Sequence, residues 1–230
     1  MGIKDKIVVA VDGPAGSGKS SVCKKTAIDL GMKYIDSGAI YRAITWYFMN
    51  NYMNFRELSD PVIKLDGVNI KQVFEKDGNA RTFVNDKDVS LLIREEGVAQ
   101  NISYFSDNSR IREFVNILLR KWAGESSIIM DGRVIGTVVF PDAELKIYLD
   151  ASVEVRTSRR VKEYSELGKN VDENSIRNQI ILRDSKDKTR EVAPLKKADG
   201  AFYLDTSEME FDDVVEKLKE LISEVNDFEK

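Results

Sequence analysis

The sequence predicts an α/β fold in which one five-stranded parallel sheet carries helices on both faces. Five short, mostly continuous apolar runs predict the strands, and they occupy residues 7–11, 33–35, 127–130, 145–149 and 201–204. Continuous apolar runs are typical of strands that are buried on both faces. Helical stretches separate most of the runs, which indicates β-α-β units and hence a parallel sheet.

An aspartate follows each predicted strand, and these residues are Asp12, Asp36, Asp131, Asp150 and Asp205. In open parallel sheets, ligands bind beyond the carboxyl ends of the strands, so the five acids surround the place where phosphates and Mg²⁺ would lie. For Asp150 and Asp205 we favour turn and helix-cap chemistry. For Asp36 and Asp131 we favour a function at that site.

The first strand runs into "GPAGSGKS", residues 13–20, which matches G-x-x-x-x-G-K-[ST] at every position. Glycines let the backbone turn tightly, so that several N–H groups point at phosphate oxygens, and the following helix adds the positive end of its dipole. Lys19 reaches the outer phosphates. The predicted ligands of Mg²⁺ are Ser20, Asp131 and Asp36. The predicted ATP contacts are Gly13, Pro14, Ala15, Gly16, Ser17, Gly18, Lys19, Ser20 and Ser21.

A second anion site is predicted where the second strand ends, at "DSGAIYR", residues 36–42. The helix amides near Ser37 and Gly38, with Arg42 one turn further on, favour a bound anion opposite the first site. Arg133, two residues after Asp131, adds a third positive group near this edge of the sheet.

Residues 60–90 contain Asp-Gly twice, at 66–67 and 77–78, between short β-like segments. This pattern predicts a small antiparallel insert between the second and third core strands. Residues 85–88 read "NDKD", which resembles in composition, but not in order, the N-K-x-D element of guanine-nucleotide switches. We interpret them as a turn, and a GTPase switch loses most of its support.

The segment 152–190 is dense in charge and predicts helices, with Gly168 as a break. Arg183, Asp187 and Arg190 have the spacing i, i+4 and i+7, which predicts one helix face. That face is either a solvated salt-bridge surface or, beside two other anion sites, a set of phosphate ligands with Asp187 free for sugar hydroxyls. Residues 211–225 predict an amphipathic core helix that begins with a capping box at Ser207 and Glu210.

Bulk composition excludes several classes of function. The net charge of −4 argues against a general nucleic-acid binder. Histidine is absent, which excludes imidazole bases and histidine metal ligands. The one cysteine, Cys23, allows no intrachain disulfide and predicts a buried thiol in a reducing compartment. No apolar run approaches the ~20 residues of a membrane span, and the first six residues leave no room for a signal peptide. We expect a cytoplasmic monomer whose partners are small molecules.

Taken together, the motifs resemble those of the bacterial cytidylate kinases, in the nucleoside monophosphate kinase group of P-loop proteins. The resemblance rests on "DGPAGSGKS", "DSGAIYR", "DVS…IR…V", "MDGR…GTVVFPDA…KIYLDAS" and "RD…D…R…VAPL" and covers nearly the whole chain. It implies phosphoryl transfer from ATP to CMP or dCMP within one domain, residues 1–230. The core would be residues 1–36, 125–151 and 191–230, the monophosphate-binding region 37–124, and the lid 152–190.

The same resemblance implies roles for individual residues. Lys19, Arg133 and Arg190 would be catalytic, and Asp187 would contact the sugar. The acceptor's phosphate and neighbouring groups would be held by Ser37, Arg42, Arg133, Arg183 and Arg190. The cytosine edge would contact Ser103 and Arg112. The lid arginines that close over the ATP phosphates would be Arg156, Arg159 and Arg160.

One position departs from the family pattern. The family usually has Gly-Arg-Asp, with the aspartate recognising the cytosine amino group, whereas this chain has Gly132-Arg133-Val134. Valine accepts no hydrogen bond, and a polar discriminator can carry large selectivity. Either Ser103 and Arg112 carry the selectivity, or UMP is also accepted, or activity is reduced, which is the least favoured. A kinase for a non-nucleotide metabolite and a nucleotide-binding regulator are the rival functions.

Overall fold

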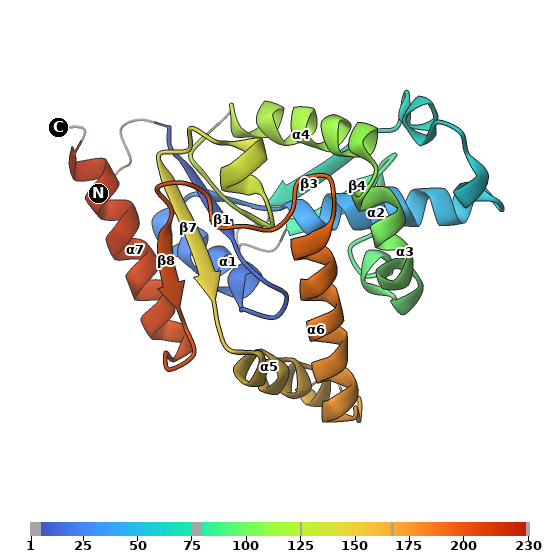
Figure 1. Ribbon diagram of the computed structural model, residues 1–230. Coiled ribbons are helices and arrows are strands. Elements are labelled where there is room, and N and C mark those ends of the chain that lie inside the picture. The colour runs from blue at the N-terminus through green and yellow to red at the C-terminus, as the bar shows by residue number, and fades with distance from the viewer. Residues whose placement is uncertain (1–5, 75–79, 125, 167, 229–230) are drawn as a thin grey trace.

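The computed structural model describes residues 6–74, 80–124, 126–166 and 168–228 (Figure 1). Its central sheet has five parallel strands in the order β2-β6-β1-β7-β8. They are β1 (Val8–Asp12), β2 (Lys33–Asp36), β6 (Ile128–Gly132), β7 (Leu145–Asp150) and β8 (Phe202–Asp205). All five predicted strands are confirmed, as is the parallel sheet.

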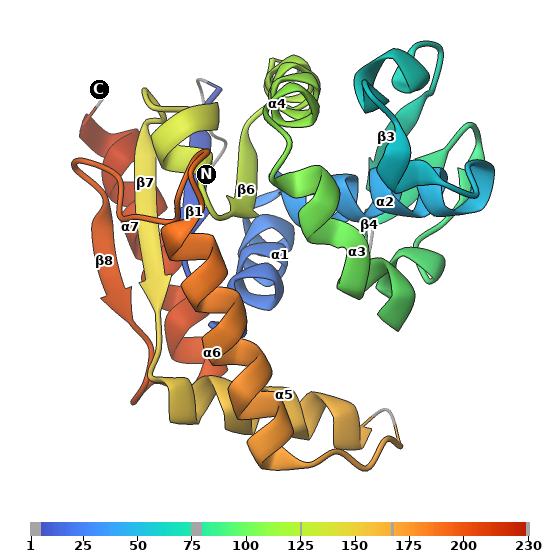
Figure 2. The same cartoon turned by 45° about the vertical axis from the view of Figure 1, so that its right-hand side comes forward.

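Helices cover both faces of the sheet. On one face, α1 (Lys19–Leu30) packs beside α7 (Phe211–Phe228), and on the other lie α2 (Ser37–Asn51) and α4 (Ser109–Ala123) (Figures 1 and 2). Successive residues of β1 face opposite ways: Val9 and Val11 join the α1 and α7 core, whereas Ala10 joins the α2 and α4 core. This two-sided burial explains why the strands are apolar throughout.

The predicted C-terminal helix is confirmed, but its predicted capping box is wrong. Helix α7 begins at Phe211, and the Val214 N–H bonds the Glu210 carbonyl oxygen, so Glu210 occupies the cap position. The Ser207 hydroxyl instead donates to Asp205 Oδ1 over 2.6 Å. The hydroxyl is therefore used in the turn after β8, which confirms turn chemistry for Asp205. Turn chemistry is also confirmed for Asp150, because its Oδ1 accepts the Ala151 N–H.

The antiparallel insert is confirmed as a separate sheet of β3 (Ile70–Phe74), β4 (Ala80–Val84) and β5 (Lys87–Asp88). Asn85 and Asp86 have φ values of 48° and 63° and form the turn between β4 and β5, which confirms the turn for 85–86, whereas residues 87–88 form β5. The predicted turn at 77–78 lies outside the described residues. Short helical turns (55–57, 61–65 and 92–94) and α3 (Glu96–Ser106) complete this region.

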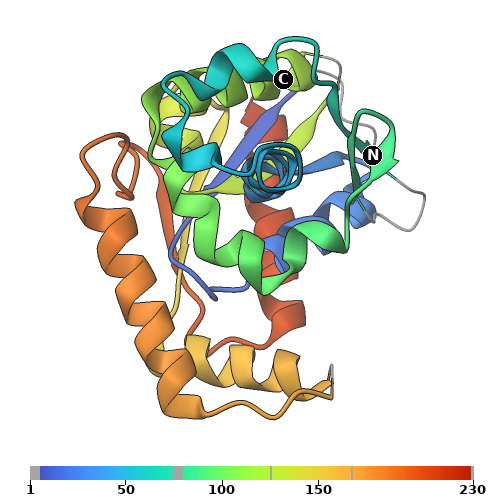
Figure 3. The same cartoon turned by 90° about the vertical axis from the view of Figure 1, so that its right-hand side faces the viewer.

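The charged segment forms two helices, α5 (Val153–Glu166) and α6 (Glu173–Thr189), which run along one side of the molecule as an L-shaped pair (Figure 3). The predicted break is confirmed, because Gly168 has a φ of +71°. Arg183 and Asp187 lie on one helix as predicted, but Arg190 is the C-cap residue and lies outside the helix. Helix α6 ends at Thr189, and the chain turns back so that the Leu195 N–H donates to the Asp187 carbonyl. No helix within the described residues is long and apolar enough to cross a membrane.

Candidate active site

The loop between β1 and α1 has the geometry of a phosphate cradle. Gly13, Gly16 and Gly18 all have positive φ values. At Gly13 a side chain is excluded outright, because an added Cβ would lie 2.0 Å from the Leu149 carbonyl oxygen of β7. The backbone therefore passes against the sheet edge in a shape that only glycine permits, and α1 starts immediately afterwards.

Lys19 lies inside this cradle. Its Nζ donates to the Pro14 carbonyl oxygen over 2.7 Å and to Ser17 Oγ over 3.1 Å, and the side chain is buried. Burial, reinforced by the positive charge of Arg133, lowers the pKa of Lys19 to about 7. An ammonium whose charge is so poorly compensated gains much from a phosphate beside it.

The Asp131 carboxylate is held by two hydroxyl groups from different elements. Ser20 Oγ donates to Oδ2 over 2.8 Å, and the Tyr34 hydroxyl donates to Oδ1 over 2.7 Å. Burial and the neighbouring charge of Asp36 raise the pKa of Asp131. Asp36 is adjacent because β2 and β6 pair these two aspartates in register. The sequence did not predict a role for Tyr34. The one feature that could have indicated it is a polar hydroxyl in a strand predicted to be buried.

The oxygen donors here suit Mg²⁺. A serine hydroxyl and one or two carboxylates are hard ligands, and Mg²⁺ usually adds water and substrate phosphates to such a partial set. Among the described residues there is no group of three or more acidic, histidine or cysteine side chains placed to hold a metal. Asp36 also caps α2, since its Oδ1 accepts the Ala39 N–H over 2.9 Å. Ser20 and Asp131 therefore fit the ion best.

Asp12 holds the backbone of a neighbouring segment, which its position at the end of β1 did not predict. Its two carboxylate oxygens accept the backbone N–H groups of Ile135 and Gly136, over 2.7 and 2.8 Å. Burial raises its pKa to about 6 despite these bonds. The carboxylate anchors the start of a π-helical turn, residues 135–139, directly after Arg133. It thereby fixes the backbone from which Arg133 extends.

Four arginines from three regions of the chain meet beside the cradle. Arg133 Nε donates to Asp187 Oδ2 over 2.9 Å, and Arg190 Nη1 lies 3.4 Å from Oδ1. Burial would raise the pKa of Asp187, but these arginines prevail and lower it. Burial lowers the pKa of Arg183 to about 10, and so do the charges of Arg133 and Arg42. The excess of positive charge in this cluster is the feature that would suit a bound anion.

Ser37 and Arg112 border the arginine cluster. The Ser37 hydroxyl donates to the Asp131 carbonyl oxygen over 2.7 Å, at the first turn of α2. Arg112 is buried, with its guanidinium 5.7 Å from the centre of the Tyr41 ring, and its Nε has no hydrogen-bond partner among the described residues. Burial, and after it the charge of Arg112, lowers the pKa of Arg190, which also has an unpartnered buried nitrogen, Nη2. These free donors indicate a place for an acceptor-bearing ligand.

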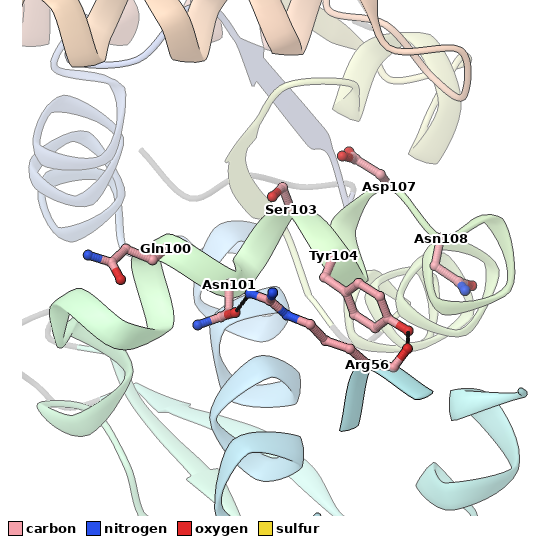
Figure 4. A pocket seen from close by; sticks show the side chains of 7 residues that line it. All are labelled: Arg56, Gln100, Asn101, Ser103, Tyr104, Asp107 and Asn108. Atoms are coloured by element: carbon pink, nitrogen blue, oxygen red, sulfur yellow. Dashed lines mark hydrogen bonds between the residues drawn. The ribbon is translucent and has the colours of Figure 1, made fainter. Parts of the chain in front are cut away.

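Ser103 lines an open cavity of about 530 Å³ (Figure 4). Figure 4 shows its hydroxyl and the Asp107 carboxylate pointing to the same side, whereas Arg56 and Tyr104 extend along the other. Asp107 is also close enough to Arg190 for its charge to raise that residue's pKa, although burial and Arg112 lower it to about 10. Ser103 thus shares a cavity with Asp107, whose charge acts on Arg190.

The three predicted lid arginines all lie on α5 but make different contacts. Arg159 donates to the Ser17 carbonyl oxygen over 3.3 Å and to Thr206, so it borders the cradle. Arg160 is more exposed and forms an ion pair with Glu163. Arg156 is buried beneath the cradle, where its Nη1 donates to the Ala15 carbonyl oxygen over 2.8 Å. The Arg156 guanidinium is thus engaged with the loop backbone and with Asp184.

A family model described as cytidylate kinase matches residues 9–224. The chain belongs to the cytidylate kinase family. The cytidylate kinase of Lactobacillus gasseri is 42% identical, and the match covers 96% of each chain. That of Exiguobacterium sibiricum is 42% identical over 94% of this chain and 96% of its own.

Solved structures support the fold alone. TT1252 from Thermus thermophilus has a TM-score of 0.52 at 13% identity and covers 96% of this chain and 98% of its own. An uncharacterized protein from Eubacterium ventriosum has a TM-score of 0.54 at 15% identity, over 95% and 99% of the two chains. Membership of the cytidylate kinase family therefore rests on sequence, and the site geometry described above agrees with it.

Proposed function

We propose that this chain transfers the γ-phosphoryl group of ATP to CMP or dCMP, giving ADP and the corresponding diphosphate. The observation that carries the proposal is the juxtaposition of two anion sites at one sheet edge. The phosphate cradle with Lys19 lies on one side, and the cluster of Arg42, Arg133, Arg183 and Arg190 lies on the other. A donor phosphate and an acceptor phosphate would meet between them, as the cytidylate kinase family requires.

On the donor side, the loop amides and Lys19 would bind the β- and γ-phosphates. Lys19 would exchange its bonds to Pro14 and Ser17 for phosphate oxygens. Ser20 and Asp131, with Asp36 nearby, would hold Mg²⁺, which neutralises developing negative charge on the phosphates. Arg159, which borders the cradle, and Arg160, on the same helix, would close over ATP.

On the acceptor side, the arginine cluster would bind the monophosphate, with Ser37 at the N-terminus of α2 as a further contact. Asp187 would accept hydrogen bonds from the sugar hydroxyls. Ser103 and Arg112 would read the pyrimidine, and the unpartnered Arg112 Nε is a donor free for this task. Val134 is buried and supplies no polar atom there beyond its backbone.

The reaction needs no protein base. The nucleophile is a phosphate oxygen whose second pKa, near ~6, leaves it mostly ionised at pH 7. This agrees with a chain that has no histidine. Arg183 keeps its charge at neutral pH, because its pKa of about 10 lies well above 7. Catalysis would consist of in-line positioning and charge neutralisation by Lys19, Arg133 and Arg190.

The organisation of the chain is part of the same proposal. Residues 37–124 would form the monophosphate-binding region, and residues 152–190, which contain α5 and α6, the lid. Closure of the lid would exclude water, which otherwise accepts the phosphoryl group and wastes ATP. The enzyme would act as a monomer in the cytoplasm.

The test is ADP formation from ATP and Mg²⁺ with CMP, dCMP, UMP, AMP and GMP in parallel, beside a control without acceptor. Turnover confined to CMP and dCMP is the expected result. Comparable turnover with UMP would show that Val134 broadens the acceptor range. Silence with all five would refute the proposal and favour a metabolite kinase or a nucleotide-binding regulator.

A further inference from the structure

Both backbone polar groups of Ala15, in the middle of the phosphate cradle, are held by the lid helices. Asp184 Oδ1, on α6, accepts the Ala15 N–H over 3.1 Å. Arg156 Nη1, on α5, donates to the Ala15 carbonyl oxygen over 2.8 Å. The two side chains also pair with each other, Nη1 to Oδ2, at 2.5 Å. We call Asp184, Arg156 and Ala15 the loop clamp.

The loop clamp is buried and well anchored. Side-chain exposure is 5% for Arg156 and 10% for Asp184. Arg156 Nε also donates to the carbonyl oxygen of Ala151, two residues before α5 begins, over 2.9 Å. The loop packs closely on the same helix, because a Cβ at Gly16 would lie 3.3 Å from Arg156 Cβ. Figures 1 and 3 show the blue loop after β1 facing α6.

Peptide planarity makes the loop clamp set the direction of neighbouring groups. In a trans peptide the C=O and the following N–H point opposite ways. Because the Ala15 carbonyl points at Arg156, the Gly16 N–H points away from it, and that N–H has no acceptor among the described residues. Because the Ala15 N–H points at Asp184, the Pro14 carbonyl points the other way, where Lys19 Nζ meets it.

The pairing also removes an electrostatic problem. A carboxylate that contacts the middle of a phosphate cradle would repel an incoming triphosphate if it were unpaired. The Arg156 guanidinium neutralises Asp184 at short range while both remain out of water, where charges are weakly screened. The cradle can therefore use Asp184 as a backbone acceptor without losing its attraction for anions.

We propose that Asp184 is a positioning residue for ATP, acting through Arg156 and Ala15. The loop clamp keeps the Gly16 N–H turned toward the nucleotide and ties the base of the α5–α6 pair to the cradle. This inference deepens the proposed function, on which its kinetic readout rests.

The experiment compares three variants with the wild type. Asp184→Ala removes the loop clamp, and Asp184→Asn keeps an oxygen acceptor for the Ala15 N–H but loses the charge. The matched control is Arg177→Gln, which breaks the exposed Arg177–Glu154 ion pair between the same two helices. KM for ATP, KM for CMP and kcat are measured, with ADP affinity by titration calorimetry and folding by thermal melts.

We expect Asp184→Ala to raise KM for ATP and the Kd for ADP about tenfold. A rise of that size corresponds to the loss of one charge-assisted hydrogen bond. KM for CMP should change less than about twofold, Asp184→Asn should be intermediate, and Arg177→Gln should match the wild type. If Asp184→Ala does not fold, Arg156→Lys replaces it, because lysine keeps the charge but cannot bond Ala15, Ala151 and Asp184 with one planar group.

Two results would overturn the inference. One is an equal rise in KM for ATP and CMP, which would indicate only a general loss of structure. The other is an unchanged Kd for ADP in a folded variant. The ADP titration needs no acceptor, so it still tests the loop clamp if the chain fails to phosphorylate CMP. A failure of the inference and a failure of the proposed function are thereby distinguishable.

Discussion

The substitution Tyr34→Phe tests how strongly β2 holds the Asp131 carboxylate. It deletes one hydroxyl and keeps the ring, so it removes the 2.7 Å bond to Asp131 Oδ1 without opening a large cavity. A hydrogen bond to a charged group contributes about 1.5–3 kcal/mol. We expect the free energy of unfolding to fall by about that amount at pH 8, which for a chain of this size lowers Tm by about 3–12 °C.

The loss should depend on pH in a defined direction. Burial raises the pKa of Asp131 above its ordinary 3.8, and the bond from Tyr34 opposes that rise. A raised folded-state pKa means that stability is lost as pH rises through it, because the ionised carboxylate is the disfavoured form. Without the Tyr34 hydroxyl, the free-energy cost of ionising Asp131 in the folded state is larger. As pH falls through this raised pKa the folded carboxyl is protonated and the bond becomes neutral, so the loss should shrink toward about 0.5–1.5 kcal/mol.

The assay is urea unfolding of both proteins at pH 4 and pH 8, followed by circular dichroism. The control is Tyr203→Phe, which deletes a hydroxyl that donates to Asp150 Oδ2 over 3.2 Å at an exposed position. We expect that variant to lose less than about 0.5 kcal/mol at either pH. Equal losses in the two variants, or a larger loss for Tyr34→Phe at pH 4 than at pH 8, would refute the reasoning. The Mg²⁺ concentration for half-maximal turnover should also rise in Tyr34→Phe alone.

Three further predictions concern the cradle and the acceptor base. Lys19→Ala should lower kcat/KM about 10²–10³-fold with an unchanged circular dichroism spectrum; near-normal turnover would contradict a catalytic Lys19. Burial lowers the pKa of Lys19 to about 7, so ADP binding at pH 8 should take up a proton. Calorimetry in two buffers of different ionisation enthalpy checks this uptake, which Lys19→Ala should lack. Val134→Asp should raise the preference for CMP over UMP at least about tenfold; an unchanged ratio of kcat/KM would show that position 134 does not read the base.

The sequence by itself determined the features whose signal is local. Continuous apolar runs identified the five strands, because burial on both faces leaves no polar alternation. The cradle was predictable residue by residue, since its glycines, Lys19 and Ser20 are contiguous and its shape depends on φ angles that glycine allows. The prediction that Cys23 is a buried thiol is confirmed.

Helix boundaries were less predictable, because the decisive partners are not neighbours in the sequence. The spacing of Arg183, Asp187 and Arg190 fits a helix face, yet α6 ends before Arg190. The turn there is closed by a bond from Leu195 to the Asp187 carbonyl and by Arg190 Nε to the Ala193 carbonyl. Periodicity carries no information on such competing bonds.

Only the tertiary structure decided which distant charges meet. Strand register places Asp36 beside Asp131, and the docking of α6 brings Asp187 to Arg133, 54 positions away in the sequence. The same docking brings Asp184 to Ala15, 169 positions away. Asp184 is one acid among many in a charged segment. The composition of that segment predicts that such side chains face solvent. The burial of Asp184 against the cradle depends on how two helices pack over a loop, and short-range sequence patterns do not encode that packing.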